Sequence, residues 1–432
     1  MIGRTNAGGG GGLKSAIIVT APTGSTVTAT SGGTVKNATE KNGVWTFQRL
    51  DLGAWTITAT KGGETDTQTV NITAINVYRV TLAYVHIYGI QRDITNPSPA
   101  WVRTDDAVGL TATATVGTVA GHSDFNDCYP WRGIKRETLS TGDVMVKIPK
   151  FWFQRYREGN VEYIKITDRA TTGFTLHPAF NHGGVTKDYL YVGAYKITSG
   201  NKSASGVSPL VNQTRATMRS NAKAKGTGWG IIDIAALSAI QMLVLVEFAN
   251  NNVQSVIGRG YCDSNNSELS TGTCNNVSGL TGRPAGTDGK VDVVWRGIEG
   301  LWGNVWEWVD GVNWNNGTYY VCNDPSTYAD DTTANYTTLS FKGATNWAGS
   351  FITAEGLDTG SNPHIMLPSA AGNGSETIYD CDACWSGTGW RVLAHGGFRA
   401  SGSQCGLFTT ELNGPSSGSY SFFGSRLLYI PD

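Results

Sequence analysis

The sequence predicts a mainly β protein with an α+β C-terminal part: a small N-terminal β-sandwich followed by a larger domain with long loops. Three features of the 432-residue chain favour this class. Short bursts of alternating apolar and polar residues occur near its start, and after Val80 this alternation fades while aromatic residues and Gly/Asn-rich segments become more frequent. The composition includes 56 Gly and 14 Trp. Glycine permits tight turns and tryptophan supplies large, half-buried anchors, a combination typical of loop-rich β proteins.

The segment 15–85 is predicted to form the small sandwich. Short bursts rich in β-branched residues recur there, separated by turn formers such as Pro22-Thr23-Gly24 and Lys41-Asn42-Gly43. Short strands at such spacing are typical of a sandwich. The bursts cover residues 16–20, 25–29, 44–47, 55–59 and 69–72. We expect the preceding segment, 1–14, to be a leader that is either flexible or ordered by a partner.

The region 86–432 is predicted to form one large domain, because no linker is evident inside it. One helix is well marked: Asp233 can cap its start, and apolar residues recur at helical spacing from Ile234 to Phe248. A second helix is compatible with the segment from Val211 to Lys223. The remainder is expected to be short strands and long loops, and loops of such length in a compact domain usually carry function.

Composition excludes several kinds of partner. The net charge is −1 and only 16% of residues are charged, so no basic excess exists to neutralise the phosphates of a nucleic acid. The longest apolar stretch, 231–249, is interrupted by Asp233, Gln241 and Glu247, which favours a buried helix over membrane insertion. No apolar segment typical of a secretory signal precedes Lys14.

No catalytic constellation is evident, and no catalytic residue is predicted. The chain has no Gly-X-Ser-X-Gly elbow, P-loop or paired-carboxylate signature. Its seven cysteines form no regular framework. Cys381 and Cys384 leave three alternatives open: a loop disulfide, a redox pair, or half of a zinc site completed by Cys262 and Cys274.

Two segments near the C-terminus are the most informative. Gly303–Trp308 places two indoles on alternate positions, so Trp306 and Trp308 are expected on one face and Glu307 on the other, where it can accept hydrogen bonds from loop amides. The second segment, 396–427, is a Gly- and Ser-punctuated run that we call the display segment.

Further motifs precede these two in a fixed order: Ser123–Phe125 with Pro130-Trp131, Lys147–Phe151, Gly228–Gly230, Val256–Gly260 and Trp295–Glu299. The ordered set resembles the C-type-lectin-like domain of the formylglycine-generating-enzyme (sulfatase-modifying) superfamily. Within that superfamily it looks most like phage and prophage tail proteins with a variable binding face, which a diversity-generating retroelement targets in some relatives. The resemblance implies a C-type-lectin-like receptor-binding domain over 86–432.

The resemblance also divides the display segment into scaffold and exposed positions. The expected scaffold is Gly396, Gly397, Gly402, Gly406, Phe408, Leu412, Pro415, Gly424, Arg426 and Leu427. The expected outward, receptor-binding residues are Phe398, Arg399, Ala400, Ser401, Ser403, Gln404, Thr410, Glu411, Asn413, Ser417, Ser419, Tyr420, Ser421 and Phe422. Aromatic anchors mixed with short polar groups are typical of paratopes. Adenine-directed diversification of Asn-type codons yields residues such as Ser, Tyr, Phe and Asn. It does not yield Gln404 or Glu411, which therefore count against active diversification.

In catalytic relatives the segment around Gly303 holds calcium. Carried over, the candidate ligands are Gly303, Val305 and Glu307, but Gly300 stands where relatives supply an Asp or Asn ligand. No cofactor is therefore required, and a structural role for Glu307 is favoured over calcium binding.

The resulting hypothesis is a phage tail-tip or fibre adhesin, made in the host cytoplasm and assembled into the virion. Its N-terminal region would contact other tail proteins, and its C-terminal face would bind a bacterial surface receptor, protein or glycan, without catalysis. A homotrimer would multiply weak contacts through avidity. One alternative, a formylglycine-type oxidase, needs two cysteines where the chain has only Cys405, with Thr409 four positions on. Another, a bacterial carbohydrate-binding surface lectin, predicts a secretion signal and calcium.

Overall fold

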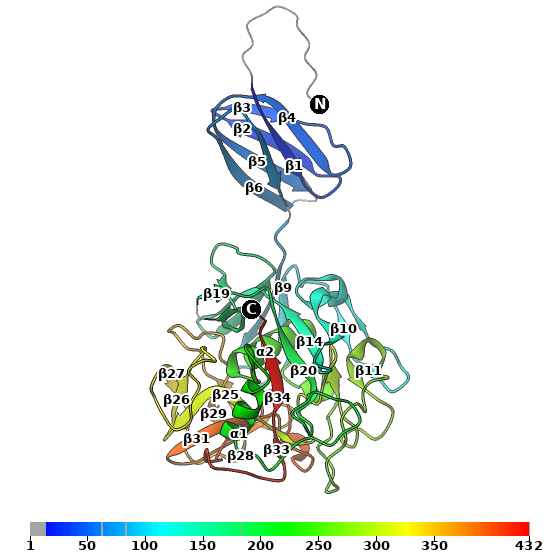
Figure 1. Cartoon of the computed structure of the whole chain (residues 1–432), viewed down its shortest axis with the longest axis vertical. Helices are drawn as coiled ribbons and strands as arrows, with labels where there is room; N and C mark the ends of the chain where they lie inside the picture. The colour runs from blue at the N-terminus through cyan, green and yellow to red at the C-terminus, as the bar shows by residue number, and fades with distance from the viewer. Residues whose placement is uncertain (1–13, 62–63, 83, 183, 432) are drawn as a thin grey trace, which may run out of the picture. The chain divides into compact units, whose positions relative to one another are not determined.

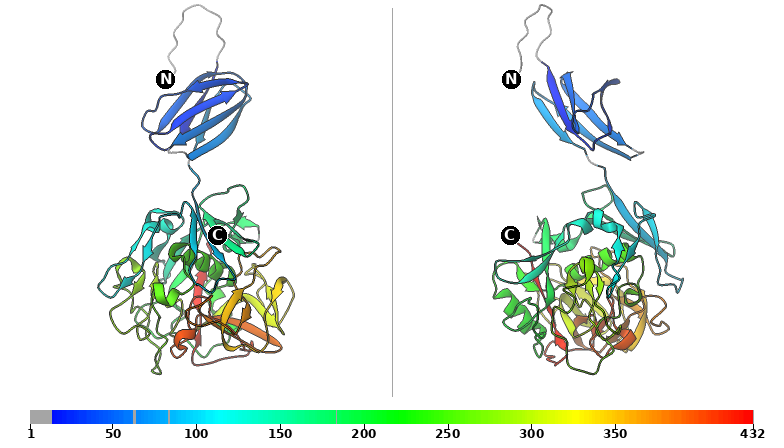
Figure 2. Two further views of the ribbon diagram at one scale, coloured as in Figure 1. Left: turned by 180° about the vertical axis from the view of Figure 1, so that it is seen from behind. Right: turned by 90° about the vertical axis from the view of Figure 1, so that its right-hand side faces the viewer.

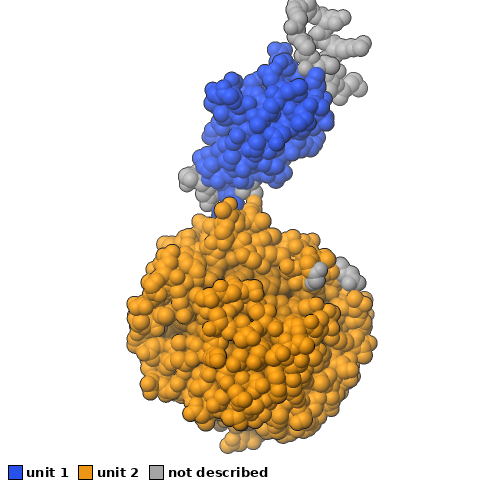
Figure 3. Space-filling model, turned by 90° about the vertical axis from the view of Figure 1, so that its left-hand side faces the viewer, with its two compact units in different colours: residues 1–86 blue, residues 87–432 orange. Residues whose placement is uncertain are grey.

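The computed structural model describes residues 14–61, 64–82, 84–182 and 184–431. The chain divides into two compact units, Met1–His86 and Ile87–Asp432 (Figure 3). All of the expected leader except Lys14 lies outside the described residues. No helix in the described part of the chain is long and apolar enough to cross a membrane.

The first unit is a sandwich of two sheets. Its strands alternate buried and exposed residues, so that Ile17, Val19, Trp45 and Ile57 meet in one core. The strands β3 and β7 lie outside the predicted bursts, and β7 pairs in parallel with β1. One sheet is β4 (Val44–Leu50), β1 (Ser15–Thr20) and β7 (Val77–Thr81); the other is β3 (Thr34–Asn37), β2 (Thr26–Ser31), β5 (Gly53–Lys61) and β6 (Glu64–Ile72).

The second unit is built around helix α2 (Ile234–Phe248), which lies in its interior (Figures 1 and 2). The predicted cap is confirmed, because the Asp233 carboxylate accepts the N–H of Ala236 at 2.8 Å. Every residue of α2 is buried, and its one carboxylate, Glu247, pairs with Arg296 at 2.7 Å. The second helix, α1 (Arg215–Lys223), begins after a Thr214 cap, and a short α3 spans Val253–Val256.

Several sheets surround α2. A five-stranded sheet orders β13 (Lys135–Thr138), β14 (Val144–Pro149), β20 (Tyr189–Lys196), β34 (Arg426–Tyr429) and β21 (Trp229–Ile231). Another orders β17 (Thr175–Leu176), β15 (Trp152–Glu158), β16 (Val161–Thr167), β8 (Ile87–Asp93) and β9 (Val102–Asp105). The shorter pairings join β11 (Thr115–Val116), β22 (Gly282–Arg283), β23 (Val294–Trp295) and β24 (Ile298–Glu299), then β10 (Ala112–Thr113) with β12 (His122–Ser123), and β18 (Asn181–His182) with β19 (Val185–Thr186).

The largest sheet carries the C-terminal motifs. Its orange and red strands β31 and β33 lie at one end of the second unit in the views of Figures 1 and 2. The order is β27 (Thr337–Lys342), β26 (Thr318–Val321), β25 (Trp306–Asn315), β31 (Trp390–His395), β32 (Thr410–Leu412), β30 (Ala383–Ser386), β28 (Ala348–Glu355) and β29 (Pro368–Ala371), with β33 (Phe423–Gly424) paired to β25.

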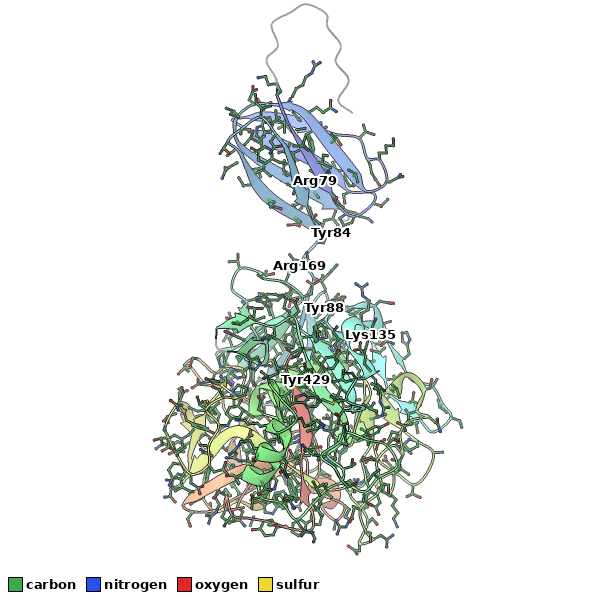
Figure 4. All side chains as sticks on the ribbon, viewed as in Figure 1. Arg79, Tyr84, Tyr88, Lys135, Arg169 and Tyr429 are labelled. Atoms are coloured by element: carbon green, nitrogen blue, oxygen red, sulfur yellow. The ribbon has the colours of Figure 1, made fainter. Side chains whose placement is uncertain are left out.

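The last strand, β34, joins two segments that are distant in the sequence. It pairs with β20 on one side and β21 on the other. Tyr429, labelled in Figure 4, stacks on Trp229 with ring centroids 4.6 Å apart. The display segment is thereby anchored at its end in a second sheet. Together these elements confirm the predicted mainly β class and the long-looped architecture expected of a C-type-lectin-like domain.

Candidate functional site

The register of the largest sheet gathers distant residues on one face. Trp308 is paired with Ala394, Ala394 with Glu411, and Glu411 with Trp385. Residues paired across a ladder share a face, and side chains along a strand alternate between faces. Trp306 therefore lies on the same face as Trp308, as predicted, together with Glu411 and Trp385.

This face opens into a hollow of about 430 Å³, which we call the aromatic groove. Half of its lining residues are aromatic, and most come from the display segment. The lining is Trp306, Trp385, Phe398, Ala400, Ser401, Gln404, Glu411, Asn413, Gly414, Tyr420, Phe422 and Phe423. The structure thus brings together eight of the predicted receptor-binding residues and adds walls from Trp306, Trp385 and Phe423.

Three rings of the display segment pack against one another in the groove and form a ring cluster. Phe422 has its centroid 5.1 Å from that of Phe398 and 5.7 Å from that of Tyr420, with interplanar angles of 32° and 21°. The two indoles meet differently: Trp306 and Trp385 are edge to face at 5.6 Å. The groove therefore combines this ring cluster with an edge-to-face indole pair.

Glu411 is the carboxylate of the groove, and it is only 8% exposed. Burial raises its pKa to about 7, against the opposing effects of the Asn413 and Gly414 N–H groups and the charge of Arg391. The Asn413 N–H donates to it at 2.6 Å. Among the described residues no cation forms an ion pair with Glu411, so it is a buried acid without a charged partner.

Other polar groups of the groove are also unpaired within the part of the chain that the structure describes. The indole N–H groups of Trp306 and Trp385 have no acceptor there, whereas Trp308 donates to the Gln213 carbonyl at 3.0 Å. Asn413 is exposed, and its side-chain amide has no partner among these residues. Gln404 donates to the Gly349 carbonyl at 2.8 Å, which leaves its carbonyl oxygen free to accept.

The opposite face of the sheet holds Glu307 in a closed ion cluster. One of its oxygens accepts from Lys196 and from Arg426, both at 2.7 Å. Burial alone would raise the pKa of Glu307, but the charges of Arg426 and Lys196 outweigh it and lower the pKa to about 2. The predicted hydrogen bonds from loop amides were therefore wrong: two cationic side chains take their place.

The same ion cluster disfavours calcium binding by the candidate ligands Gly303, Val305 and Glu307. Two cations already neutralise Glu307 and would repel a divalent ion, so these residues do not fit a calcium site. Gly303 instead meets a packing requirement, because a Cβ there would lie 2.9 Å from the backbone of Tyr261. Within the described residues no cluster of His, Cys, Asp or Glu is arranged to hold a metal.

Three residues expected to face outward are buried. Thr410 is 4% exposed because it alternates with Glu411 and so lies on the core face of β32. Glu411 and Ser401 are each 8% exposed because they line the groove, where Ser401 accepts the Phe398 N–H. Five further expected residues lie outside the groove lining: Arg399, Ser403, Ser417, Ser419 and Ser421.

Two of the scaffold glycines, Gly397 and Gly406, are explained by close approach. A Cβ at Gly397, whose φ is +78°, would lie 2.6 Å from the Cys405 sulfur. A Cβ at Gly406 would overlap the Asp382 carboxylate. Neither position can accept a side chain without moving its neighbours.

All seven cysteines are free thiols, including Cys381 and Cys384, so the disulfide alternative is not realised in this structure. One feature was not predicted: the Cys262 thiol acts electrostatically on the Cys405 thiol. Burial raises the pKa of Cys405, and its thiol donates to the Gly396 carbonyl at 2.9 Å. A buried thiol held in its neutral form is a structural group and a poor metal ligand.

A larger hollow of about 750 Å³ lies near α1 and β21 and includes no display residue. Some of its polar groups are engaged within the fold: Asp233 caps α2 and accepts from Tyr328 at 2.9 Å, and Lys223 donates to the Pro325 carbonyl. The Nδ1 atom of His182, in contrast, is buried without a hydrogen-bond partner among the described residues. The aromatic groove is the stronger candidate for a binding site, because half of its lining residues are aromatic and most of them come from the display segment.

No protein-family model and no curated protein sequence matches the chain. Among solved structures, the chain is similar to the Major Tropism Determinant U1 variant at 11% identity, with 89% of this chain and 82% of that chain covered and a TM-score of 0.28. It is also similar to the Major Tropism Determinant P3c variant at 9% identity, with the same coverage and a TM-score of 0.26. Similarity of this degree is too distant to assign a family.

Proposed function

We propose that the chain is a non-catalytic adhesin of a phage tail tip or fibre, and that the aromatic groove binds a receptor on the bacterial surface. The observation that carries this proposal is the groove itself. Aromatic side chains and unpaired polar groups, most of them from one C-terminal segment, converge on a single face of a rigid sheet. Burying them against a partner would remove apolar area from water and satisfy the polar groups.

The division between scaffold and groove supports a tolerant binding face. Gly397, Gly406 and Arg426 are fixed by contacts inside the fold, whereas the exposed Ala400 and Asn413 can change without loss of an internal side-chain hydrogen bond among the described residues. Gln404 and Glu411 make internal hydrogen bonds. We therefore propose that any variation, including retroelement-driven variation, is confined to the remaining groove and rim positions.

The first unit has its own core, which suits a spacer or attachment module. In the proposal, the N-terminal region contacts other tail proteins in the virion, and the protein is a homotrimer. Three grooves on one particle would raise the effective concentration of each weak contact. Native mass spectrometry of the purified chain tests this state: a monomer at micromolar concentration would contradict the trimer.

Binding to bacterial cells tests the adhesin proposal. We would compare the full chain with Phe398→Ala/Tyr420→Ala/Phe422→Ala on a panel of gut and environmental strains. Strain-selective binding that the triple variant loses by about a hundredfold or more is expected, because hot-spot residues dominate interfaces. Circular dichroism and thermal unfolding would show that the variant remains folded.

A matched control separates the groove from exposed aromatic area in general. Tyr156 and Tyr163 form a stacked, partly exposed pair on β15 and β16, with centroids 4.9 Å apart. Tyr156→Ala/Tyr163→Ala is expected to bind like the unchanged chain. Equal loss in both variants would contradict a groove-specific site, and binding to no strain would contradict the adhesin function.

A further inference from the structure

The unpaired groups of the aromatic groove include both hydrogen-bond donors and acceptors. The N–H groups of Trp306 and Trp385 can only donate, whereas the free carbonyl oxygen of Gln404 can only accept. The Asn413 amide can do both. A partner must therefore supply acceptors and donors together, because each group left unpaired on burial costs about 1–3 kcal/mol.

This requirement separates the classes of ligand. A simple cation, such as an ammonium group, offers only donors and would leave both indoles unpaired. An anion, such as phosphate, offers acceptors and would face the Glu411 carboxyl. A purely apolar group would satisfy none of the polar groups. A hydroxyl group both donates and accepts, so a ligand that carries several hydroxyls matches the whole set.

The ring cluster of Phe398, Tyr420 and Phe422 adds a second requirement. Phe422 is stacked on Tyr420 and tilted by 32° against Phe398, so the three rings form an apolar cluster next to the polar groups. A pyranose ring has the same division: its C–H groups form an apolar face and its hydroxyls project from the rim. The volume of about 430 Å³ falls within the usual range of small-ligand pockets, about 300–1,000 Å³.

From these features we infer that the aromatic groove is a metal-independent subsite for a neutral sugar ring of a bacterial surface glycan. The inference rests on the proposed adhesin function and narrows its receptor to one chemical class. The sugar's apolar face packs against the ring cluster, and its hydroxyls pair with the indole N–H groups, Gln404, Asn413 and Glu411. Glu307 is already paired with two cations, so it does not supply a metal ion for sugar recognition.

The test uses a strain that the full chain binds. Its surface polysaccharide is extracted, freed of protein and offered to the full chain in saturation-transfer NMR with EDTA present. We expect transfer to sugar-ring C–H protons, and the same polysaccharide should compete with cell binding. Protease treatment of the cells should leave binding unchanged.

Two variants connect the signal to the groove. Trp385→Ala is expected to lower affinity for the polysaccharide by about tenfold or more, and Asn413→Ala by several-fold. Trp390→Ala is the matched control, because Trp390 is a partly exposed indole of the same sheet outside the groove. It should bind like the unchanged chain, and thermal unfolding would confirm that each variant is folded.

Each opposite result overturns the inference. Cell binding that protease removes and the polysaccharide does not compete would identify a protein receptor and leave the adhesin function standing. Polysaccharide binding that EDTA abolishes would contradict metal independence, and binding unaffected by Trp385→Ala would place the sugar elsewhere. Binding to no cell would instead contradict the adhesin function itself.

Discussion

Two glutamates on opposite faces of the largest sheet have opposite electrostatic environments. Glu307 and Glu411 are both buried, at 0% and 8% exposure. Glu307 contacts two cations, and their charges lower its pKa to about 2 despite burial. Glu411 has no ion-pair partner among the described residues, and burial raises its pKa to about 7.

The difference separates a group that stabilises the fold from one that is available to a ligand. The Glu307 carboxylate is satisfied internally by two cations, so it has nothing to offer a partner. On the same face, the Nδ1 atom of His395 is buried without a hydrogen-bond partner among the described residues. The face of Glu411 contains donors and acceptors that the fold leaves unpaired, which costs stability unless a ligand or water satisfies them. Unpaired groups in a concave site are therefore better evidence of function than burial or charge alone.

The largest expected effect on stability comes from disrupting the ion cluster around Glu307. Glu307→Gln removes the carboxylate that pairs with both Lys196 and Arg426, and it is expected to lower the free energy of unfolding by about 3–5 kcal/mol. Urea unfolding at neutral pH measures this. Glu158→Gln, at an exposed position, is the control and should change stability by less than about 0.5 kcal/mol. A loss below about 1 kcal/mol for Glu307→Gln would show that the cluster is not essential.

The second effect is the reverse: removing the acid of the groove should stabilise the fold at high pH. A pKa raised in the folded state means that ionisation of Glu411 opposes folding above its unfolded pKa, near 4.5, and the full cost is reached above about 7. Glu411→Gln should therefore match the unchanged chain near pH 4.5 and exceed it by about 1–3 kcal/mol at pH 8. The glutamine oxygen can still accept the Asn413 N–H.

Unfolding of both proteins across this pH range provides the measurement. The charged or titratable groups that act electrostatically on Glu411 include Arg391 on β31 and Cys384 on β30, and the substitution leaves them unchanged. Taking the difference between the two proteins removes contributions from other buried acids. A stability difference that is constant with pH would show that Glu411 ionises normally.

The sequence was sufficient for features that local pattern determines. Asp233 before a run of apolar residues identified helix α2, and alternation in Gly303–Trp308 placed Trp306 and Trp308 on one face. The display segment was recognised from its Gly and Ser punctuation and its resemblance to tail proteins. Eight of its expected receptor-binding residues do line one hollow.

The remainder depended on pairings between distant segments. Trp385 enters the groove only because β30 pairs in parallel with β32, and Lys196 reaches Glu307 from another sheet. Thr410 was expected outward because the phase of its short strand could not be read from the sequence, and a shift of one residue reverses every side chain. No local pattern in the chain encodes these three facts.

The third prediction compares neighbouring indoles with the same substitution. Trp308→Phe removes a hydrogen bond to the Gln213 carbonyl, whereas Trp306→Phe removes an N–H that has no acceptor in the fold. Because the volume lost is the same, Trp308→Phe should be less stable by about 1 kcal/mol. Receptor binding should show the opposite order, with Trp306→Phe several-fold weaker. Equal stabilities would indicate that the Trp306 N–H is satisfied in the free protein.

The smallest effect is expected at the rim. Ser417, Ser419 and Ser421 are exposed and lie outside the groove lining. Rim residues exclude water from an interface but contribute little binding energy, so replacing all three by alanine should change cell binding by less than about threefold and stability by less than about 0.5 kcal/mol. Titration of the variant on the bound strain, beside Asn413→Ala, measures this. If the serine variant loses more binding affinity than the Asn413 variant, recognition extends beyond the groove. The different environments of Glu307 and Glu411 would then not identify the binding site.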